Sequence, residues 1–121
     1  MADFVKFEVP ENLMQDQLAL VEKAKNKGKI KIGVNEVTKA IERGVAKLVL
    51  IAQDTSPPEI VMHLPLLCKE KNIACSVVKT KKALGEKAGI AVSTAAIAIV
   101  DEGEAKKELQ EIAKKLTELA K

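Results

Sequence analysis

Three polar side chains of different chemistry lie close together in the chain, directly after a glycine. Asn35 offers an amide, Glu36 a carboxylate and Lys39 an ammonium group, and Gly33 precedes them. Lysine and asparagine can donate hydrogen bonds to guanine acceptors, and a carboxylate can accept from exposed base N–H groups. A carboxylate on a positive surface repels phosphate, so its presence there favours base reading over backbone binding alone. The segment therefore predicts an RNA-reading element.

The same residues also have a purely structural interpretation. Asn35 can cap the amino terminus of a helix, and Glu36 is favourable near the positive end of that helix. Lys39 can pair with Glu36 three residues earlier. The spacing of these residues, taken alone, favours this structural interpretation.

Positive charge is concentrated in two segments of the chain. The net charge of +3 is small, but residues 23–39 carry six lysines and one glutamate, and residues 79–87 carry four lysines and one glutamate. Residues 1–22 are acidic, with five acids and one lysine. A nucleic-acid surface and a solvated lysine face both fit this asymmetry, and charge alone does not separate them.

The sequence offers little for catalysis or metal binding. His63 is the only histidine, and its apolar neighbours favour a packed or surface side chain over a catalytic base. Cys68 and Cys75 lack the paired spacing of structural zinc and fit two reduced, buried thiols in a cytoplasmic protein; a disulfide is possible but unsupported. Ser56 and Ser93 have no identifiable activating partner. We therefore expect no enzymatic activity, no metal and no cofactor.

The composition is typical of one folded, soluble domain over residues 1–121. Hydrophobic residues make up 47% and charged residues 31% of the chain, which is enough apolar material for a core. Phe4 and Phe7 are the only aromatic residues, which disfavours single-strand binding by base stacking. The amino terminus lacks a signal-peptide pattern and no apolar run reaches membrane-spanning length, so we expect a cytoplasmic protein without a membrane partner.

Hydrophobic periodicity predicts helices that alternate with strands, and hence an α/β/α sandwich. The first helix should begin near Pro10 and end at Gly28, with Gly28 as a left-handed cap. Strands are expected at 29–32, 47–52, 73–78 and 95–100. Further helices are expected from 34 or 35 to 43, from Pro57 and Pro58 with a kink or restart at Pro65, from about 80 to Gly85 or Gly89, and from 104 onward.

The polar segment is part of a longer pattern. Residues 33–44 read GVNEVTKAIERG, residues 46–54 read AKLVLIAQD and residues 57–61 read PPEIV, with further matches at 63–68 (HLPLLC) and 84–85. In these segments, which are spread between residues 33 and 85, the sequence resembles the L7Ae family of archaeal large-subunit ribosomal proteins. The resemblance implies a three-layer α/β/α sandwich with a mixed sheet of about four strands. It also implies binding of kink-turn RNA, an internal bend stabilised by tandem sheared G·A pairs.

The resemblance gives the polar segment a functional role in place of the structural one. It implies that Asn35, Glu36 and Lys39 contact the guanines of the G·A pairs, whose edges an ordinary helix hides. It also implies that Gly33 and Val34 bring the loop against the RNA.

Other candidate residues come from distant parts of the chain. The resemblance implies that Arg43 reaches phosphate and that Asp54 and Lys79 line the pocket of an extruded nucleotide. The apolar loop implied to pack over that nucleotide consists of Ile90, Ala91, Val92 and Ser93.

Three features depart from the family pattern. Val34 stands where the family often has a smaller or polar residue, and Gln53 replaces a common glutamate. Ala91 and Val92 lie in a variable loop that tunes which kink-turns are accepted. RNA binding is expected to survive these departures, while the preference among RNA targets stays open.

The resemblance also implies partners. The RNA partners are kink-turns of ribosomal RNA, of box C/D and H/ACA guide RNA and of ribonuclease P RNA. The protein partners are other ribonucleoprotein core proteins. The free protein is expected to be monomeric. The alternative is a protein-interaction module on the same fold without kink-turn specificity. The set Asn35, Glu36 and Lys39 favours the RNA-binding hypothesis, because a protein-interaction relative has no need of guanine-reading groups.

Overall fold

The structure is a computed structural model, and it describes residues 11–54, 63–90, 92–101, 103 and 105–119. The helices are α1 (Glu11–Lys27), α2 (Val34–Glu42), α3 (His63–Glu70), α4 (Lys81–Lys87) and α5 (Lys106–Leu119). The strands are β1 (Lys29–Ile32), β2 (Leu48–Ala52), β3 (Ala74–Val78) and β4 (Ala96–Asp101). The predicted helix start at Pro57 and Pro58 lies outside the described residues. No helix in the described ranges is long and apolar enough to cross a membrane.

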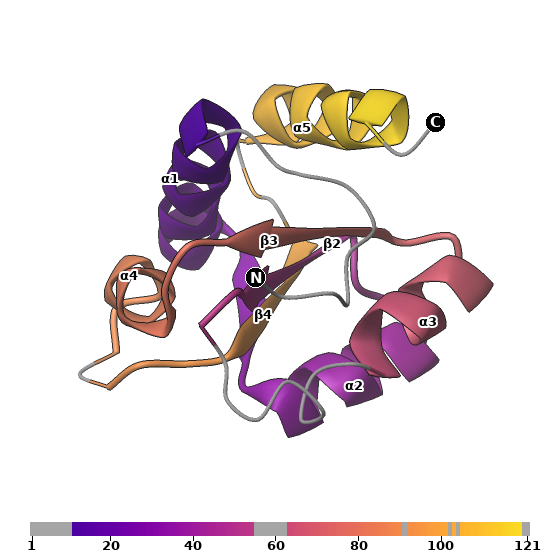
Figure 1. The fold of residues 1–121 in the computed structure, drawn as a ribbon, viewed down its shortest axis with the longest axis horizontal. Coiled ribbons are helices and arrows are strands. Elements are labelled where there is room, and N and C mark those ends of the chain that lie inside the picture. Colours follow the sequence, from indigo (N-terminus) through magenta and orange to yellow (C-terminus); the bar gives the residue numbers. More distant parts are fainter. Residues whose placement is uncertain (1–10, 55–62, 91, 102, 104, 120–121) are drawn as a thin grey trace.

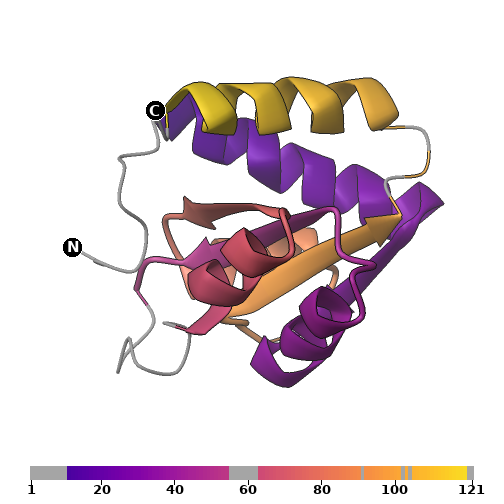
Figure 2. The same ribbon diagram turned by 90° about the vertical axis from the view of Figure 1, so that its right-hand side faces the viewer.

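The four strands form one mixed sheet between two layers of helices. The strand order is β1-β4-β2-β3, with β2 and β3 parallel and β4 antiparallel to both β1 and β2. Helices α1, α4 and α5 lie on one face of the sheet, and α2 and α3 lie on the other (Figures 1 and 2). The predicted three-layer α/β/α sandwich with a mixed four-stranded sheet is confirmed.

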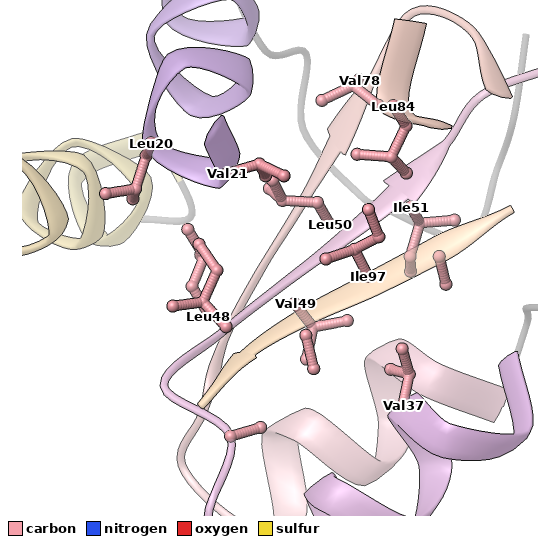
Figure 3. Packing of buried hydrophobic residues seen from close by; sticks show 14 of the residues in the cluster. Leu20, Val21, Val37, Leu48, Val49, Leu50, Ile51, Val78, Leu84 and Ile97 are labelled. Carbon is pink, nitrogen blue, oxygen red and sulfur yellow. The ribbon is translucent and has the colours of Figure 1, made fainter. Parts of the chain in front are cut away.

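The central strand β2 is buried on both faces, as its continuous apolar sequence predicts. Figure 3 shows Leu50 on the same side of the sheet as Val21 of α1, and Val49 on the side where Val37 of α2 lies. Val49 pairs with Ala98 of β4. The small side chain of Ala98 leaves room for α2 to approach the sheet. Each large aliphatic side chain buried in this way contributes roughly 1.5–3 kcal/mol to stability. The packing fixes α2 firmly against the sheet.

Gly28 ends α1 for a different reason from the one predicted. Its φ is not positive, unlike that of Gly33, Gly44, Gly89 and Gly103, so it does not adopt the left-handed conformation. A β-carbon on Gly28 would overlap the carbonyl oxygen of Asp101 and lie 2.8 Å from the backbone nitrogen of Gly103. The prediction of a left-handed cap was therefore wrong, and Gly28 is a glycine because two chain segments approach each other closely.

Helix α4 runs through Gly85, which was one of its two predicted ends, and stops before Gly89. Gly89 has a φ of 77°, which is the left-handed conformation that favours glycine after a helix. A β-carbon on Gly85 would overlap the carbonyl oxygen of Val92 and lie 3.1 Å from the Cα of Ser93. Gly85 therefore lets the segment before β4 pack directly on α4.

Candidate nucleic-acid interface

The sheet topology brings the predicted site segments to one end of the sheet. Ile32 at the end of β1 pairs with Ile97 near the start of β4. Ala52 and Val78, at the ends of β2 and β3, pair with each other. Strands β1, β2 and β3 therefore finish where β4 begins. The described residues gathered there are 33–39 after β1, 53–54 after β2, 79–82 after β3, and 90 and 92–94 before β4.

Gly33 forms the turn between β1 and α2 and is the N-cap of that helix. Its φ of 95° and ψ of 152° fall in a region that is almost restricted to glycine. Its N–H donates to the carbonyl of Ala96 at 2.9 Å, and its carbonyl accepts from the N–H of Val37 at 2.9 Å. Apart from its two chain neighbours, no described residue has an atom within 4 Å of the position that a β-carbon on Gly33 would take. The turn is thus fixed to the sheet on one side and open on the other.

Asn35 does not cap α2. The N-cap is Gly33, and no side chain caps the helix. The side chain of Asn35 is exposed and makes no hydrogen bond to another described residue. The structural interpretation of Asn35 was therefore wrong, and its amide is accessible to a ligand.

Glu36 and Lys39 form the ion pair that the structural interpretation predicts, but the pair is weak. The carboxylate and ammonium groups lie 3.9 Å apart, and the two side chains are 50% and 61% exposed. Exposed pairs of this kind contribute roughly 0–1 kcal/mol. The opposite face of α2 is buried through Val37, Ala40 and Ile41. A ligand can therefore replace the ion pair at little cost without disturbing the fold.

Arg43 lies at the far end of α2 from Gly33. Helix α2 has nine residues, so its length is about 13 Å. Arg43 follows Asn35 and Lys39 at steps of four residues, and all three side chains are exposed. They therefore form one exposed row along the helix, which Arg43 extends away from the turn at Gly33.

Asp54 supports the start of α4. Its Oδ1 atom accepts a hydrogen bond from the N–H of Lys81 at 2.9 Å. Thr80 is the N-cap of α4, and its Oγ1 atom accepts from the N–H of Ala83 at 3.1 Å. Lys79 is exposed directly before this cap. The predicted pocket residues Asp54 and Lys79 thus lie at the same end of the sheet, with one oxygen of Asp54 engaged by the backbone.

The segment before β4 presents an apolar side chain to solvent. Val92 is 70% exposed, Ser93 is exposed and Ile90 is half-buried against the core. Ala91, which was predicted to lie in the same loop, is outside the described residues. The exposed Val92 is available to pack against an apolar surface such as the face of a base.

His63 has a role that the sequence did not indicate. Its Nε2 atom lies 2.9 Å from Oγ1 of Thr38, and that hydroxyl donates to the carbonyl of Val34 at 2.8 Å. A hydroxyl has one hydrogen, so while Thr38 donates to Val34 its oxygen can accept from His63 in the tautomer that carries the proton on Nε2. The exposed His63 therefore links α3 to the first turn of α2, as a surface histidine.

The two cysteines are free thiols, with Cys68 buried and Cys75 half-buried. Hydrogen bonding to Cys68, together with burial, raises the pKa of the Cys75 thiol. The described part of the chain contains no group of three or more His, Cys, Asp or Glu residues arranged to hold a metal ion.

Comparison with known proteins shows the family of this chain. The model of the ribosomal protein L7Ae/L30e/S12e/Gadd45 family matches residues 15–109. The chain belongs to this family. The matched range contains every candidate residue from Gly33 to Ser93. The structure is also similar to that of the Giardia lamblia 15.5kD RNA binding protein, with a TM-score of 0.89 and 34% sequence identity over 98% of this chain and 99% of that chain.

Proposed function

We propose that this member of the L7Ae/L30e/S12e/Gadd45 family binds kink-turn RNA and reads its sheared G·A pairs with Asn35, Glu36 and Lys39. The observation that carries the proposal is the exposed amide, carboxylate and ammonium set on the first turns of α2. Within the described part of the chain, these groups make only one weak ion pair with each other. The similarity to the Giardia lamblia RNA binding protein supports RNA as the ligand.

The three side chains have complementary hydrogen-bonding capacities toward guanine. Lys39 and Asn35 can donate to the O6 and N7 acceptors, while Glu36 can accept from base N–H groups. Sheared G·A pairs at a bend make these atoms reachable, whereas a regular A-form groove does not. Contact with RNA breaks the exposed ion pair between Glu36 and Lys39 and replaces it with base contacts.

A second part of the site would hold the nucleotide that the bend extrudes. Lys79 is an exposed cation beside the helix start that Asp54 supports. Val92 supplies an exposed apolar surface on the loop that packs on Gly85. We assign the extruded nucleotide to this region, with Ile90 and Ser93 beside Val92. Arg43, at the far end of α2, would contact phosphate.

The proposed cellular role is non-enzymatic and lies in ribonucleoprotein assembly. We propose that the protein, like the archaeal ribosomal proteins its sequence resembles, serves the large ribosomal subunit, the box C/D and H/ACA guide particles and ribonuclease P in the cytoplasm. In each, it would stabilise a kinked RNA onto which further proteins assemble. The rival hypothesis, a protein-interaction module without kink-turn specificity, predicts no preference for sheared G·A pairs.

A titration with two RNAs tests the proposal. One RNA contains a kink-turn, and the other has its G·A pairs replaced by Watson–Crick pairs. Each well-made base contact contributes roughly 1–3 kcal/mol of discrimination, so we expect the kink-turn RNA to bind at least about tenfold more tightly. Both affinities should fall with salt, with a slope of about −0.7 to −0.9 per neutralised phosphate. Equal affinity for the two RNAs would leave only a basic surface and refute the proposal.

A further inference from the structure

We propose that Thr94 is a positioning residue for RNA binding. It joins the loop before β4 to the turn that begins α2, so that the two RNA-facing parts of the site keep one fixed spacing. This inference rests on the proposed function. It adds a residue that is not among the proposed RNA contacts and that acts by holding those contacts in place.

One backbone carbonyl connects the two parts. The carbonyl of Ala96, in the first position of β4, accepts a hydrogen bond from the N–H of Gly33 at 2.9 Å. The same oxygen accepts from Oγ1 of Thr94 at 3.1 Å. Thr94 is 8% exposed and Ala96 is fully buried. The loop before β4 and the turn before α2 are therefore held at a single, rigid point of the sheet.

Thr94 is also bonded to the other side of the site. Its N–H donates to the carbonyl of Lys81 at 3.2 Å, and the N–H of Lys81 donates to Oδ1 of Asp54 at 2.9 Å. A continuous series of hydrogen bonds thus runs from Asp54 through Lys81, Thr94 and Ala96 to Gly33. It crosses all four segments that meet at this end of the sheet, and Thr94 lies at its centre.

The location of these bonds explains why they matter for the ligand. The guanine-reading groups follow Gly33, whereas the exposed Val92 lies on the loop that Thr94 anchors. An RNA that contacts both parts gains affinity when their spacing is set before binding, because less ordering is required on association. Loss of the Thr94 bond would let the loop shift relative to α2 and weaken contacts in both parts.

A valine at position 94 separates the hydroxyl from the packing. Thr94→Val keeps the shape of the side chain but removes the donor to Ala96. The Ala96 carbonyl keeps its bond to the N–H of Gly33, so no buried acceptor is left without a partner. Thr94→Ser restores the hydroxyl without the methyl group. Ser76→Ala is a matched control, because the buried Oγ of Ser76 has no hydrogen-bond partner among the described residues.

The first measurement is made on the free protein. Amide hydrogen exchange at position 94, whose N–H donates to the carbonyl of Lys81, should be about fivefold faster in Thr94→Val than in the native protein after correction for intrinsic rates, because the loop loses one of its anchoring hydrogen bonds. Exchange of this amide in Thr94→Ser and Ser76→Ala should stay within twofold of the native rate. Unchanged exchange at position 94 in Thr94→Val would overturn the structural half of the proposal.

The second measurement is the affinity for the kink-turn RNA. Thr94→Val should weaken it about fivefold, and Thr94→Ser should restore it. Native-like affinity of Thr94→Val, or failure of Thr94→Ser to rescue binding, would overturn the positioning role. If the native protein itself does not prefer the kink-turn RNA, the proposed function fails. Exchange of the amide at position 94 would still report whether the Thr94 hydroxyl anchors the loop, so the two failures are distinguishable.

Discussion

The two ends of the sheet both depend on glycine, but for opposite reasons. At one end, Gly28 and Gly103 lie where the junction of α1 and β1 meets the junction of β4 and α5, and the neighbouring backbone leaves no room for a β-carbon. At the other end, Gly33 has open space beside it among the described residues, and only its φ of 95° demands glycine. At the end with Gly28, two backbone segments pack closely against each other. At the end with Gly33, a backbone turn is accessible to solvent.

This difference separates a structural end of the sheet from the end at which we propose that RNA binds. Gly28 serves the fold, because filling its space forces two backbone segments apart. Gly33 holds an accessible turn in an uncommon conformation, which is typical of functional sites. Substitutions at the two glycines should therefore affect different properties, and this contrast can be tested directly.

The largest effect on stability is expected for Gly28→Ala. The new β-carbon would overlap the carbonyl oxygen of Asp101, and overpacking against backbone should cost about 3 kcal/mol. Urea unfolding measures this loss. The ratio of affinities for the kink-turn RNA and its Watson–Crick counterpart should not change in the folded protein. A changed ratio would mean that this end of the sheet also takes part in recognition.

Gly33→Ala should have a smaller effect on stability and a clear effect on binding. The alanine meets no described atom, so its cost is the backbone strain of a positive φ, about 2 kcal/mol. Relief of that strain would rotate the first turn of α2 and weaken kink-turn binding. The measurements are the same unfolding and titration experiments as for Gly28→Ala. If Gly33→Ala bound kink-turn RNA as tightly as the native protein, the proposal that Gly33 serves binding and Gly28 serves stability would be contradicted.

A smaller stability effect is expected for His63→Ala, which removes the hydrogen-bond partner of Thr38 on α3. One partly exposed hydrogen bond contributes about 1 kcal/mol, and its loss loosens the first turn of α2. His63→Gln is the matched control, because its amide can still donate. Affinity for kink-turn RNA should fall several-fold in the alanine variant and recover in the glutamine variant. Equal binding by all three proteins would show that this link does not position α2.

Much of the fold follows from local sequence patterns. The continuous apolar sequence of β2 predicts a strand buried on both faces, and the glycines at 44 and 89 predict helix ends that the structure has. The predicted cap at Gly28 was wrong, and Gly85 could not be distinguished from Gly89 as the end of α4, because the reasons for Gly28 and Gly85 are tertiary. Each makes room for backbone from a distant part of the chain, and no local pattern contains that information.

The candidate site was only partly predictable for the same reason. The polar set on α2 lies within five consecutive residues, so its residue types could be recognised. The hydrogen bonds from Thr94 to Ala96 and from His63 to Thr38 join segments that only the folded chain brings together. Gln17 is a further example, since its buried Nε2 donates to the carbonyl of Val77 on the edge strand β3. A strand order is needed before such partners can be named.

The substitution Glu36→Ala tests base reading against simple charge attraction. It removes a negative charge from a surface flanked by lysines, so electrostatics alone predicts tighter RNA binding. If Glu36 accepts hydrogen bonds from guanine, its loss should weaken binding by roughly 1–3 kcal/mol, or about tenfold or more. Its ion pair with Lys39 is exposed and weak, so the free energy of unfolding should change by less than about 1 kcal/mol.

The measurement that decides between these outcomes is the affinity of Glu36→Ala for kink-turn RNA, compared with the native protein at the same salt concentration. We predict weaker binding and a reduced preference for RNA with G·A pairs. Equal or tighter binding would contradict guanine recognition by Glu36 and indicate a surface that attracts RNA by charge alone.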